Sequence, residues 1–252
     1  MTPPDLADTG VPPTRTAAEA LSAGSRELVV EEIRGAERFL VVTHEHPDGD
    51  ALGSLVAMQG VLRALEKDSI MFIAENEFPL PQEYRFFPLD GLVTSIPDDL
   101  ERRTVVFLDC GNIERNPAHL LRDVSPLLNI DHHHDNTHFG TVDHVVPEAS
   151  CTAEIIWDLM DALEVPLTPT IADALYVGLI TDTGRFSYEN TGARSQPRVS
   201  WCFLGAGSSG PPSWVSSSSV SGASTWPLAP RSRIASGRGS SRRARLAPAG
   251  SV

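Results

Sequence analysis

The chain has 252 residues and a formal net charge of −13 at pH 7, and this charge is unevenly distributed. All 33 Asp and Glu residues precede residue 197, whereas the rest of the chain carries seven Arg and no acidic residue. The acidic body excludes the binding of long nucleic acid through a basic groove, because phosphate affinity depends on clustered Lys and Arg. A small anionic substrate is compatible with this charge if metal ions supply the positive charge.

The cysteines and the hydropathy pattern favour a soluble, cytoplasmic protein. The three cysteines, Cys110, Cys151 and Cys202, are too few and too scattered for a disulfide framework or a CxxC zinc site. The chain has no stretch of 18 apolar residues and no apolar leader segment. We therefore expect neither a membrane span nor export.

Strand-like and helix-like segments alternate after a polar, Pro-rich lead-in over residues 1–16, which we expect to be disordered. The expected elements are a helix over 26–38, a strand over 39–43, a helix over 50–66, strands over 69–74, 104–109 and 127–131, and helices over 150–163 and 170–181. Such alternation predicts βαβ units and therefore an α/β fold, a parallel sheet with helices on both faces.

Residues 197–252 have a different composition from the body. They contain 15 Ser, with many Pro, Gly and Ala, and no Asp, Glu, Lys or His. This composition predicts a disordered low-complexity tail, because too little apolar surface can be buried to offset chain entropy. The abrupt change near Gln196 suggests a reading-frame shift, and a native basic linker is the alternative. The expected organisation is a lead-in over 1–16, one catalytic domain over 17–196 and the tail.

The first group with chemical potential follows the strand expected over 39–43. His44, Asp48 and Asp50 offer one imidazole and two carboxylates, while Gly49 permits a tight turn. In open α/β sheets, ligands bind at the carboxyl ends of strands, which is where this group lies. The alternative is that either Asp only caps the next helix.

Three further groups stand where a predicted strand or helix ends. They are Asp109, then Asp131 with His132, His133 and His134, and finally Asp182. A lone Asp after a strand is also common at loop starts, and consecutive histidines can arise by chance in a polar loop. The last Asp closes a helix that is apolar nearly all round, so we expect it to be buried and to need a partner such as a metal ion.

These groups together predict a centre for two metal ions. Four aspartates with two or three histidines can hold two divalent ions about 3.5–4 Å apart with one bridging Asp. Mixed oxygen and imidazole ligands suit Mn²⁺, and the lack of thiolates argues against structural zinc. Paired ions lower the pKa of a bridging water and neutralise a phosphate, which is the chemistry of phosphoester hydrolysis.

Four motifs in this order make the sequence resemble the DHH family of phosphoesterases over residues 26–196. They read His44-x-x-Pro47-Asp48-Gly49-Asp50-Ala51-x-Gly53-Ser54, Asp109, Asp131-His132-His133 and Thr181-Asp182-Thr183-Gly184. The resemblance implies one ion held by His44, Asp48 and Asp109, and a second held by Asp50, Asp109, His132 and Asp182, with Asp109 as the bridge. It also implies that Asp131 orients its neighbours and that His133 contacts the scissile phosphate. His46 and His134 are expected at the rim.

Within this family, residues 150–154 and 181–191 are most similar to the nano-RNase and 3′-phosphoadenosine 5′-phosphate (PAP) phosphatase branch, whose bifunctional oligoribonucleases remove mononucleotides from very short oligonucleotides. The resemblance therefore implies a hydrolase, an exonuclease-like oligoribonuclease and nucleotide phosphatase, whose partners are short oligonucleotides or a nucleotide. Cyclic dinucleotide phosphodiesterases share the core and are the alternative, while family II pyrophosphatases match less well. A homodimer is a further possibility, because apolar helix faces in such folds often pair.

One departure from the family concerns the substrate. Members of this type have a second, C-terminal domain whose glycine-rich motif and basic residues hold the substrate, and residues 197–252 contain no Gly-Gly-Gly-His. We therefore expect metal binding with strongly weakened or absent turnover. The rival interpretation is a non-catalytic remnant that binds metal. A third, binding of polyanions by the arginines of the tail, implies little selectivity.

Overall fold

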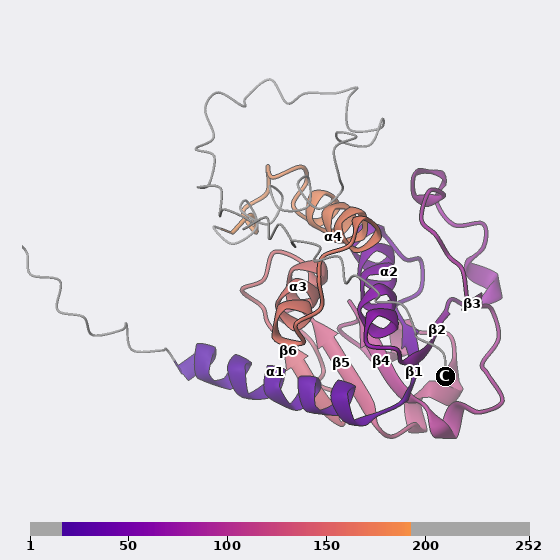
Figure 1. Ribbon diagram of the computed structural model, residues 1–252. Helices are drawn as coiled ribbons and strands as arrows, with labels where there is room; N and C mark the ends of the chain where they lie inside the picture. Colours follow the sequence, from indigo (N-terminus) through magenta and orange to yellow (C-terminus); the bar gives the residue numbers. More distant parts are fainter. Residues whose placement is uncertain (1–16, 193–252) are drawn as a thin grey trace, which may run out of the picture. The chain divides into compact units, whose positions relative to one another are not determined.

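The computed structural model describes residues 17–192, in which one sheet is flanked by helices (Figure 1). Its elements are α1 (Ala17–Gly35), β1 (Arg38–Val42), α2 (Gly49–Ala64), β2 (Asp68–Phe72), β3 (Leu92–Val93), β4 (Thr104–Leu108), β5 (Leu127–Asp131), β6 (Val142–Val145), α3 (Thr152–Ala162) and α4 (Pro169–Asp182). Short 3-10 helices lie between the strands: η1 (Glu75–Glu77), η2 (Gln82–Tyr84), η3 (Leu100–Arg102), η4 (Ile113–Arg115) and η5 (His119–Asp123). The lead-in and the tail expected from the sequence lie outside the described residues.

The six strands are all parallel, in the order β3-β2-β1-β4-β5-β6. From β1 the chain moves outward through β2 to β3, and then returns to place β4 on the other side of β1. The boundary between β1 and β4 is thus the point where the winding direction changes. In open parallel sheets, ligands bind at the carboxyl ends of strands at such a point. The expected α/β fold with a parallel sheet is confirmed.

The two faces of the sheet are covered differently. Leu40 and Val42 lie beside Val105 and Phe107 in register, and these four form a core cluster with side chains from the loops that contain η4 and η5. The α-helices lie on the other face: α2 packs on β1, β2 and β4, α3 packs on β5, α1 packs on β6, and α4 packs on α2 and α3. Helices therefore cover both faces, as α-helices on one and 3-10 helices on the other.

Several expected boundaries need correction. The first helix was expected over 26–38, but α1 begins at Ala17, because Ala-rich sequence favours helix, and ends at Gly35. Strands β3 and β6 were not expected at all. The first is two residues long, and the second reads Val-Asp-His-Val, which lacks an apolar run. The remaining expected bounds differ from the observed ones by at most two residues.

Small residues let α4 approach α2 closely. A Cβ on Gly53 would lie 2.4 Å from the carbonyl oxygen of Ala174, and a Cβ on Gly178 would lie 2.5 Å from Asp50 Oδ1. This close approach brings the end of α4, at Asp182, to the start of α2. None of the helices between residues 17 and 192 is long and apolar enough to cross a membrane.

Candidate metal centre

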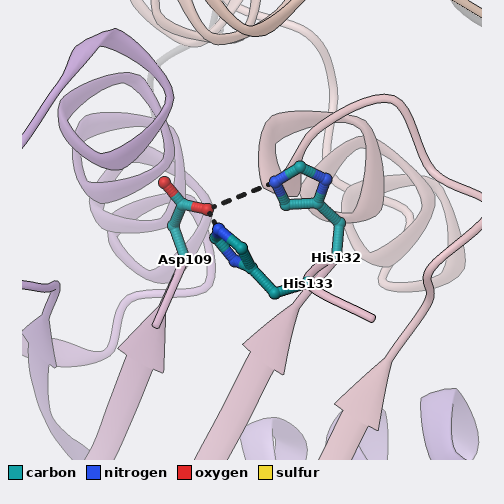
Figure 2. A group of neighbouring side chains, drawn as sticks. All are labelled: Asp109, His132 and His133. Carbon is teal, nitrogen blue, oxygen red and sulfur yellow. Dashed lines mark ion pairs between the residues drawn. The ribbon is translucent and has the colours of Figure 1, made fainter. Parts of the chain in front are cut away.

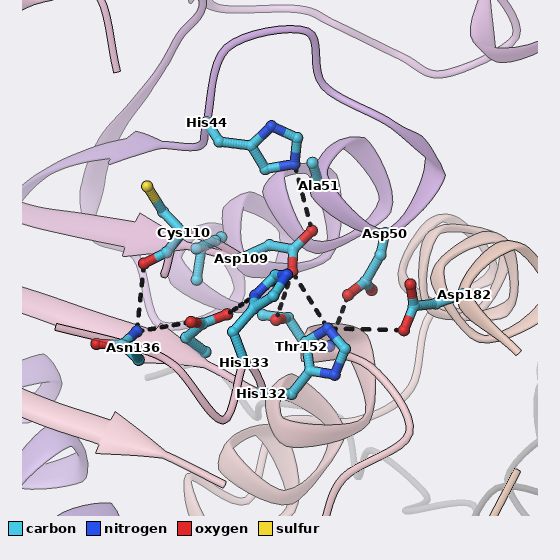
Figure 3. A network of polar contacts seen from close by, with 12 residues as sticks. His44, Asp50, Ala51, Asp109, Cys110, His132, His133, Asn136, Thr152 and Asp182 are labelled. Atoms are coloured by element: carbon cyan, nitrogen blue, oxygen red, sulfur yellow. Dashed lines mark hydrogen bonds and ion pairs between the residues drawn. The ribbon is translucent and has the colours of Figure 1, made fainter. Parts of the chain in front are cut away.

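The sequence-predicted site residues meet at the carboxyl ends of β1, β4 and β5, where the winding changes (Figure 3). The loop after β1 and the start of α2 supply His44, Asp48 and Asp50, the end of β4 is followed by Asp109, β5 leads into Asp131, His132 and His133, and α4 ends with Asp182. The structure thus brings all eight residues to one edge of the sheet. Their roles as ligands or catalytic groups stay a prediction.

Asp109 lies at the middle of this cluster. Its Oδ2 is 3.6 Å from Nε2 of His44. Its Oδ1 is 3.6 Å from Nε2 of His132 and 3.8 Å from Nδ1 of His133 (Figure 2). The side chain is buried, and its backbone has a φ of +57°, a left-handed conformation that costs a residue with a Cβ roughly 1–2 kcal/mol. The turn after β4 is therefore held in a strained form that places one carboxylate between three imidazoles.

The ligand atoms form three groups that share residues. His44, Asp48 and Asp109 make the first, Asp50, His132 and Asp182 make the second, and Asp109, His132 and His133 make the third; the atoms within each group lie within 4.8 Å of one another. The first two groups have no residue in common. Separations of 3.6 Å between imidazole nitrogen and carboxylate oxygen are too long for hydrogen bonds. They are close to the spacing of two ligands bound to one cation by bonds of about 2.0–2.2 Å. The residues therefore fit two divalent ions.

His132 connects the first two groups. Its Nε2 lies 3.6 Å from Oδ1 of Asp109 and 3.6 Å from Oδ2 of Asp182. Figure 3 shows Asp109 with His44 on one side and His132 on the other, while Asp182 approaches from α4. This arrangement allows the Asp109 carboxylate to face both ligand groups at once.

The two aspartates at the start of α2 have different partners. Oδ1 of Asp48 accepts hydrogen bonds of 3.1 Å from the backbone amides of Asp50 and Ala51, so the capping alternative holds for this oxygen. The Asp50 carboxylate instead accepts from the amides of Thr152 and Ala153 at the start of α3. Burial raises the pKa of Asp50 well above its ordinary value, and the charges of nearby carboxylates add to the rise. A cation at this position would relieve that repulsion.

Thr152 is a component of the centre that the sequence analysis did not identify. Its Oγ1 donates a hydrogen bond of 3.1 Å to Oδ1 of Asp109, and its backbone amide donates one of 2.6 Å to Oδ2 of Asp50. The residue is completely buried. Residues 150–154 carried the similarity to one branch of the family, but no local pattern connected them with carboxylates so distant in the sequence.

Hydrogen bonds orient the imidazole of His44. Its Nδ1 is 2.6 Å from the carbonyl oxygen of Glu45, to which it donates, so that Nε2 is left as an acceptor facing Asp109. Burial by itself would lower the pKa of His44, but the interactions with Asp109 and with the Glu45 carbonyl outweigh it, and the pKa is raised. This tautomer is the one that a metal ligand needs.

The pair Asp131 and His133 stands beside the cluster. Nδ1 of His133 is 2.7 Å from Oδ1 of Asp131, and this hydrogen bond is the main reason why the pKa of His133 is raised to about 9. Burial alone would raise the pKa of Asp131, but the contacts with His133 and with Asn136, whose Nδ2 donates to Oδ2 at 2.6 Å, lower it. The imidazole is therefore charged and fixed at neutral pH.

Three further residues were assigned places by the sequence. Asp182 was expected to be buried, but it is half-buried, with a side chain 27 % exposed, because it is the last residue of α4. Burial raises its pKa to about 6, against the opposing effect of His132. His134 and His46 are exposed, as expected for rim residues, and Nδ1 of His46 is 3.1 Å from Oε2 of Glu77.

The sequence of the chain matches the model of a known family. The model of the DHH family, N-terminal domain, matches residues 38–179. The chain belongs to the DHH family. This confirms the resemblance to the family. The matched residues hold the first three motifs, and Thr181-Asp182-Thr183-Gly184 follows them.

Curated relatives are similar over the same region. The bifunctional oligoribonuclease and PAP phosphatase NrnA of Thermus thermophilus is 34% identical over 166 residues, which cover 65% of this chain and 49% of the relative. A probable NrnA of Streptococcus mutans is 28% identical, over 67% of this chain and 53% of the relative. The cyclic-di-AMP phosphodiesterase GdpP of Bacillus subtilis is 24% identical, over 75% and 30%. The chain spans about half the length of the NrnA relatives it matches.

A solved structure supports the fold. An exopolyphosphatase-related protein from Bacteroides fragilis superposes with a TM-score of 0.65 at 21% identity, over 73% of this chain and 57% of that one. At this identity the likeness concerns the fold alone.

Proposed function

We propose that this chain binds two divalent metal ions, with Mn²⁺ the ion best suited to the mixed carboxylate and imidazole ligands, and provides the metal-binding half of a cytoplasmic phosphoesterase. Its substrates would be short oligonucleotides, PAP or both. The position of Asp109, with one oxygen toward His44 and the other toward His132, carries the proposal. The names of the NrnA relatives support the substrate class.

The metal ions and the two residues His133 and Asp131 would have different roles in hydrolysis. Bound ions would lower the pKa of a water and offset the charge of the phosphate. His133 faces the same carboxylate as the ligands, and its protonated form, which the hydrogen bond to Asp131 favours, would offer a positive charge and an N–H to a phosphate oxygen. Asp131 holds that imidazole in place through the bond of 2.7 Å.

Hydrolysis of cyclic dinucleotides is the second candidate, supported by the similarity to GdpP. Linear and cyclic substrates present the same phosphodiester to the metal ions, so the cluster itself does not separate them. A substrate comparison does: linear dinucleotide, PAP and cyclic di-AMP are given to the same Mn²⁺-loaded protein. We expect the first two to be hydrolysed faster.

The test of the metal centre uses the full chain and calorimetric titration with Mn²⁺. We expect two ions per chain, and a loss of at least one of them in Asp109→Asn. Asp135→Asn is the matched control. Asp135 is exposed and close in sequence to His132 and His133, and the substitution changes the charge by the same amount as Asp109→Asn. Equal Mn²⁺ binding by wild type and Asp109→Asn would contradict the proposal. Two bound ions without hydrolysis of any substrate would favour the non-catalytic interpretation.

A further inference from the structure

One cation lies at the metal centre without an acidic partner. Nη2 of Arg115, the last residue of η4, lies 3.2 Å from Nδ1 of His44. Among the side chains described, no hydrogen bond or ion pair joins another Arg or Lys to any of the eight predicted site residues. The cluster otherwise presents carboxylates and imidazoles.

The backbone around Arg115 is hydrogen-bonded across the boundary between β4 and β1, where the winding direction changes. The carbonyl oxygen of Arg115 accepts a hydrogen bond of 2.7 Å from the amide of Glu45, and Nδ2 of Asn116 donates one of 2.7 Å to the carbonyl oxygen of Thr43. These two bonds join the loop after β4 to the loop after β1. The guanidinium is therefore held near His44 by the fold.

The contact with His44 does not satisfy the guanidinium. Because Nδ1 of His44 carries the hydrogen donated to the Glu45 carbonyl, it has no lone pair left for an N–H of Arg115. Two other arginines in the described part of the chain show what such a partner is like: Arg103 lies 2.8 Å from Asp99, and Arg122 lies 2.6 Å from Glu114. Arg115 is half-buried, and no carboxylate of the described residues forms an ion pair with its guanidinium.

Arg115 also lies near the residue expected at the phosphate. The pKa of His133 is raised mainly by Asp131, and the positive charge of Arg115 acts against this rise. The positive charge of Arg115 also acts to lower the pKa of His44, so a phosphate bound beside these groups would offset a repulsion among them. Its planar set of donors matches two oxygens of one phosphate.

We propose that Arg115 binds a phosphate group of the nucleotide substrate beside the metal ions. This inference rests on the proposed function and names a substrate contact that the described chain makes for itself. A guanidinium bonded to phosphate gains charge-assisted hydrogen bonds that are absent from the unliganded site. The competing explanation is that Arg115 only positions His44, in which case its removal weakens metal binding instead.

The experiment compares binding of Mn²⁺ and of PAP by the full chain. Wild type, Arg115→Gln and Arg115→Lys are titrated first with Mn²⁺ and then, loaded with Mn²⁺, with PAP and with adenosine. Arg102→Gln is the matched control, because Arg102 is exposed on η3. We expect Arg115→Gln to bind PAP roughly 10- to 100-fold more weakly. Arg115→Lys should recover part of the loss, with Mn²⁺ and adenosine binding unchanged.

The two proposals fail in different ways. Absence of Mn²⁺ binding by wild type overturns the proposed function. If Mn²⁺ binding is normal and wild type and Arg115→Gln bind PAP with equal affinity, only the proposed role of Arg115 is overturned. The same holds if Mn²⁺-loaded wild type binds no PAP at millimolar concentration. A fall in Mn²⁺ affinity as large as the fall in PAP affinity shows that Arg115 positions His44 and does not contact phosphate.

Discussion

The backbone amide of Thr152 donates a hydrogen bond of 2.6 Å to the buried carboxylate of Asp50, which lies 102 residues earlier in the chain. Ala153 donates a second, of 3.0 Å, to the other carboxylate oxygen. Asp50 belongs to the first turn of α2, so the carboxylate connects the start of one helix with the start of another. The amides of a helix N-terminus favour a negative charge. Part of the metal centre is therefore shaped by the docking of α3.

Thr152→Val tests whether the Thr152 hydroxyl helps to hold the carboxylates of the metal centre in place. Valine keeps the shape and the backbone amide but removes the hydroxyl that donates to Asp109 at 3.1 Å. We expect the Mn²⁺ affinity to fall about 10-fold, because groups that orient metal ligands typically contribute 10- to 100-fold. The free energy of unfolding should fall by about 1 kcal/mol. Calorimetric titration and urea denaturation measure the two effects.

Thr152→Ser is the control for this variant, since serine retains the donor. It should keep most of the Mn²⁺ affinity while losing a buried methyl group. If Thr152→Val binds Mn²⁺ as tightly as wild type does, the hydroxyl does not hold Asp109 in place.

Gly178→Ala tests the close packing of α4 against the centre. The added Cβ would lie 2.5 Å from Oδ1 of Asp50 and 2.5 Å from Cβ of Ala153, so α4 must move away from α2 and α3. We expect the unfolding free energy to fall by about 1–3 kcal/mol, as for other overpacked cores, and the Mn²⁺ affinity to fall with it. Gly24→Ala, where nothing lies within 4 Å of the new Cβ, should leave both unchanged or raise stability slightly. Equal thermal melting of Gly178→Ala and wild type would contradict the packing.

The positions of the predicted site residues could be read from the sequence because each follows a local signal. Asp109 and Asp131 stand at the ends of short, mostly apolar runs, and the parallel topology brings such ends to one edge. The strands themselves were predictable for the same reason. The strand positions and the site positions were both predictable from residues that are neighbours in the sequence.

The contributions that could not be predicted depend on contacts between distant segments. Thr152 reaches Asp109 across 43 residues, and Arg115 reaches His44 across 71. Neither residue has a spacing that marks it as part of a site. Strand β6 likewise exists because it pairs with β5 along the sheet edge, although its sequence contains two polar residues in four.

Removal of metal ions should destabilise the protein in a pH-dependent way. Burial raises the pKa of Asp182 to about 6 and raises that of Asp50 as well. In the metal-free protein, the stability that these groups contribute is fully present below their ordinary pKa and is lost as the pH rises through the raised values. Cations bind the ionised forms, so Mn²⁺ should stabilise the protein more at pH 7.5 than at pH 5.

A thermal melt with and without Mn²⁺ checks this. At 100 times the Kd, we expect a stabilisation of about 2.7 kcal/mol at pH 7.5, which corresponds to roughly 5–10 °C. Asp109→Asn should lose most of this shift, and Asp135→Asn should keep it. A shift that is equal at both pH values would show that the carboxylates do not titrate in this range.

His144 provides a second dependence on pH that is independent of the metal ligands. It lies on β6, buried, with Nδ1 2.9 Å from Oγ of Ser25 on α1, and burial lowers its pKa to about 4, against the opposing charge of Asp158. The neutral form is therefore favoured in the folded state. Its contribution to stability is complete above pH 6.5 and is lost as the pH falls toward 4.

His144→Gln removes this titration while keeping a polar side chain. Between pH 7 and pH 4.5, the unfolding free energy of wild type should fall by about 2 kcal/mol more than that of the variant, since one pKa unit corresponds to about 1.4 kcal/mol. His134→Gln, at an exposed histidine, should follow the wild-type curve. Urea denaturation of the metal-free proteins at several pH values measures the difference. If wild type and His144→Gln lose stability in parallel, the docking of α1 on β6 does not depend on a neutral His144.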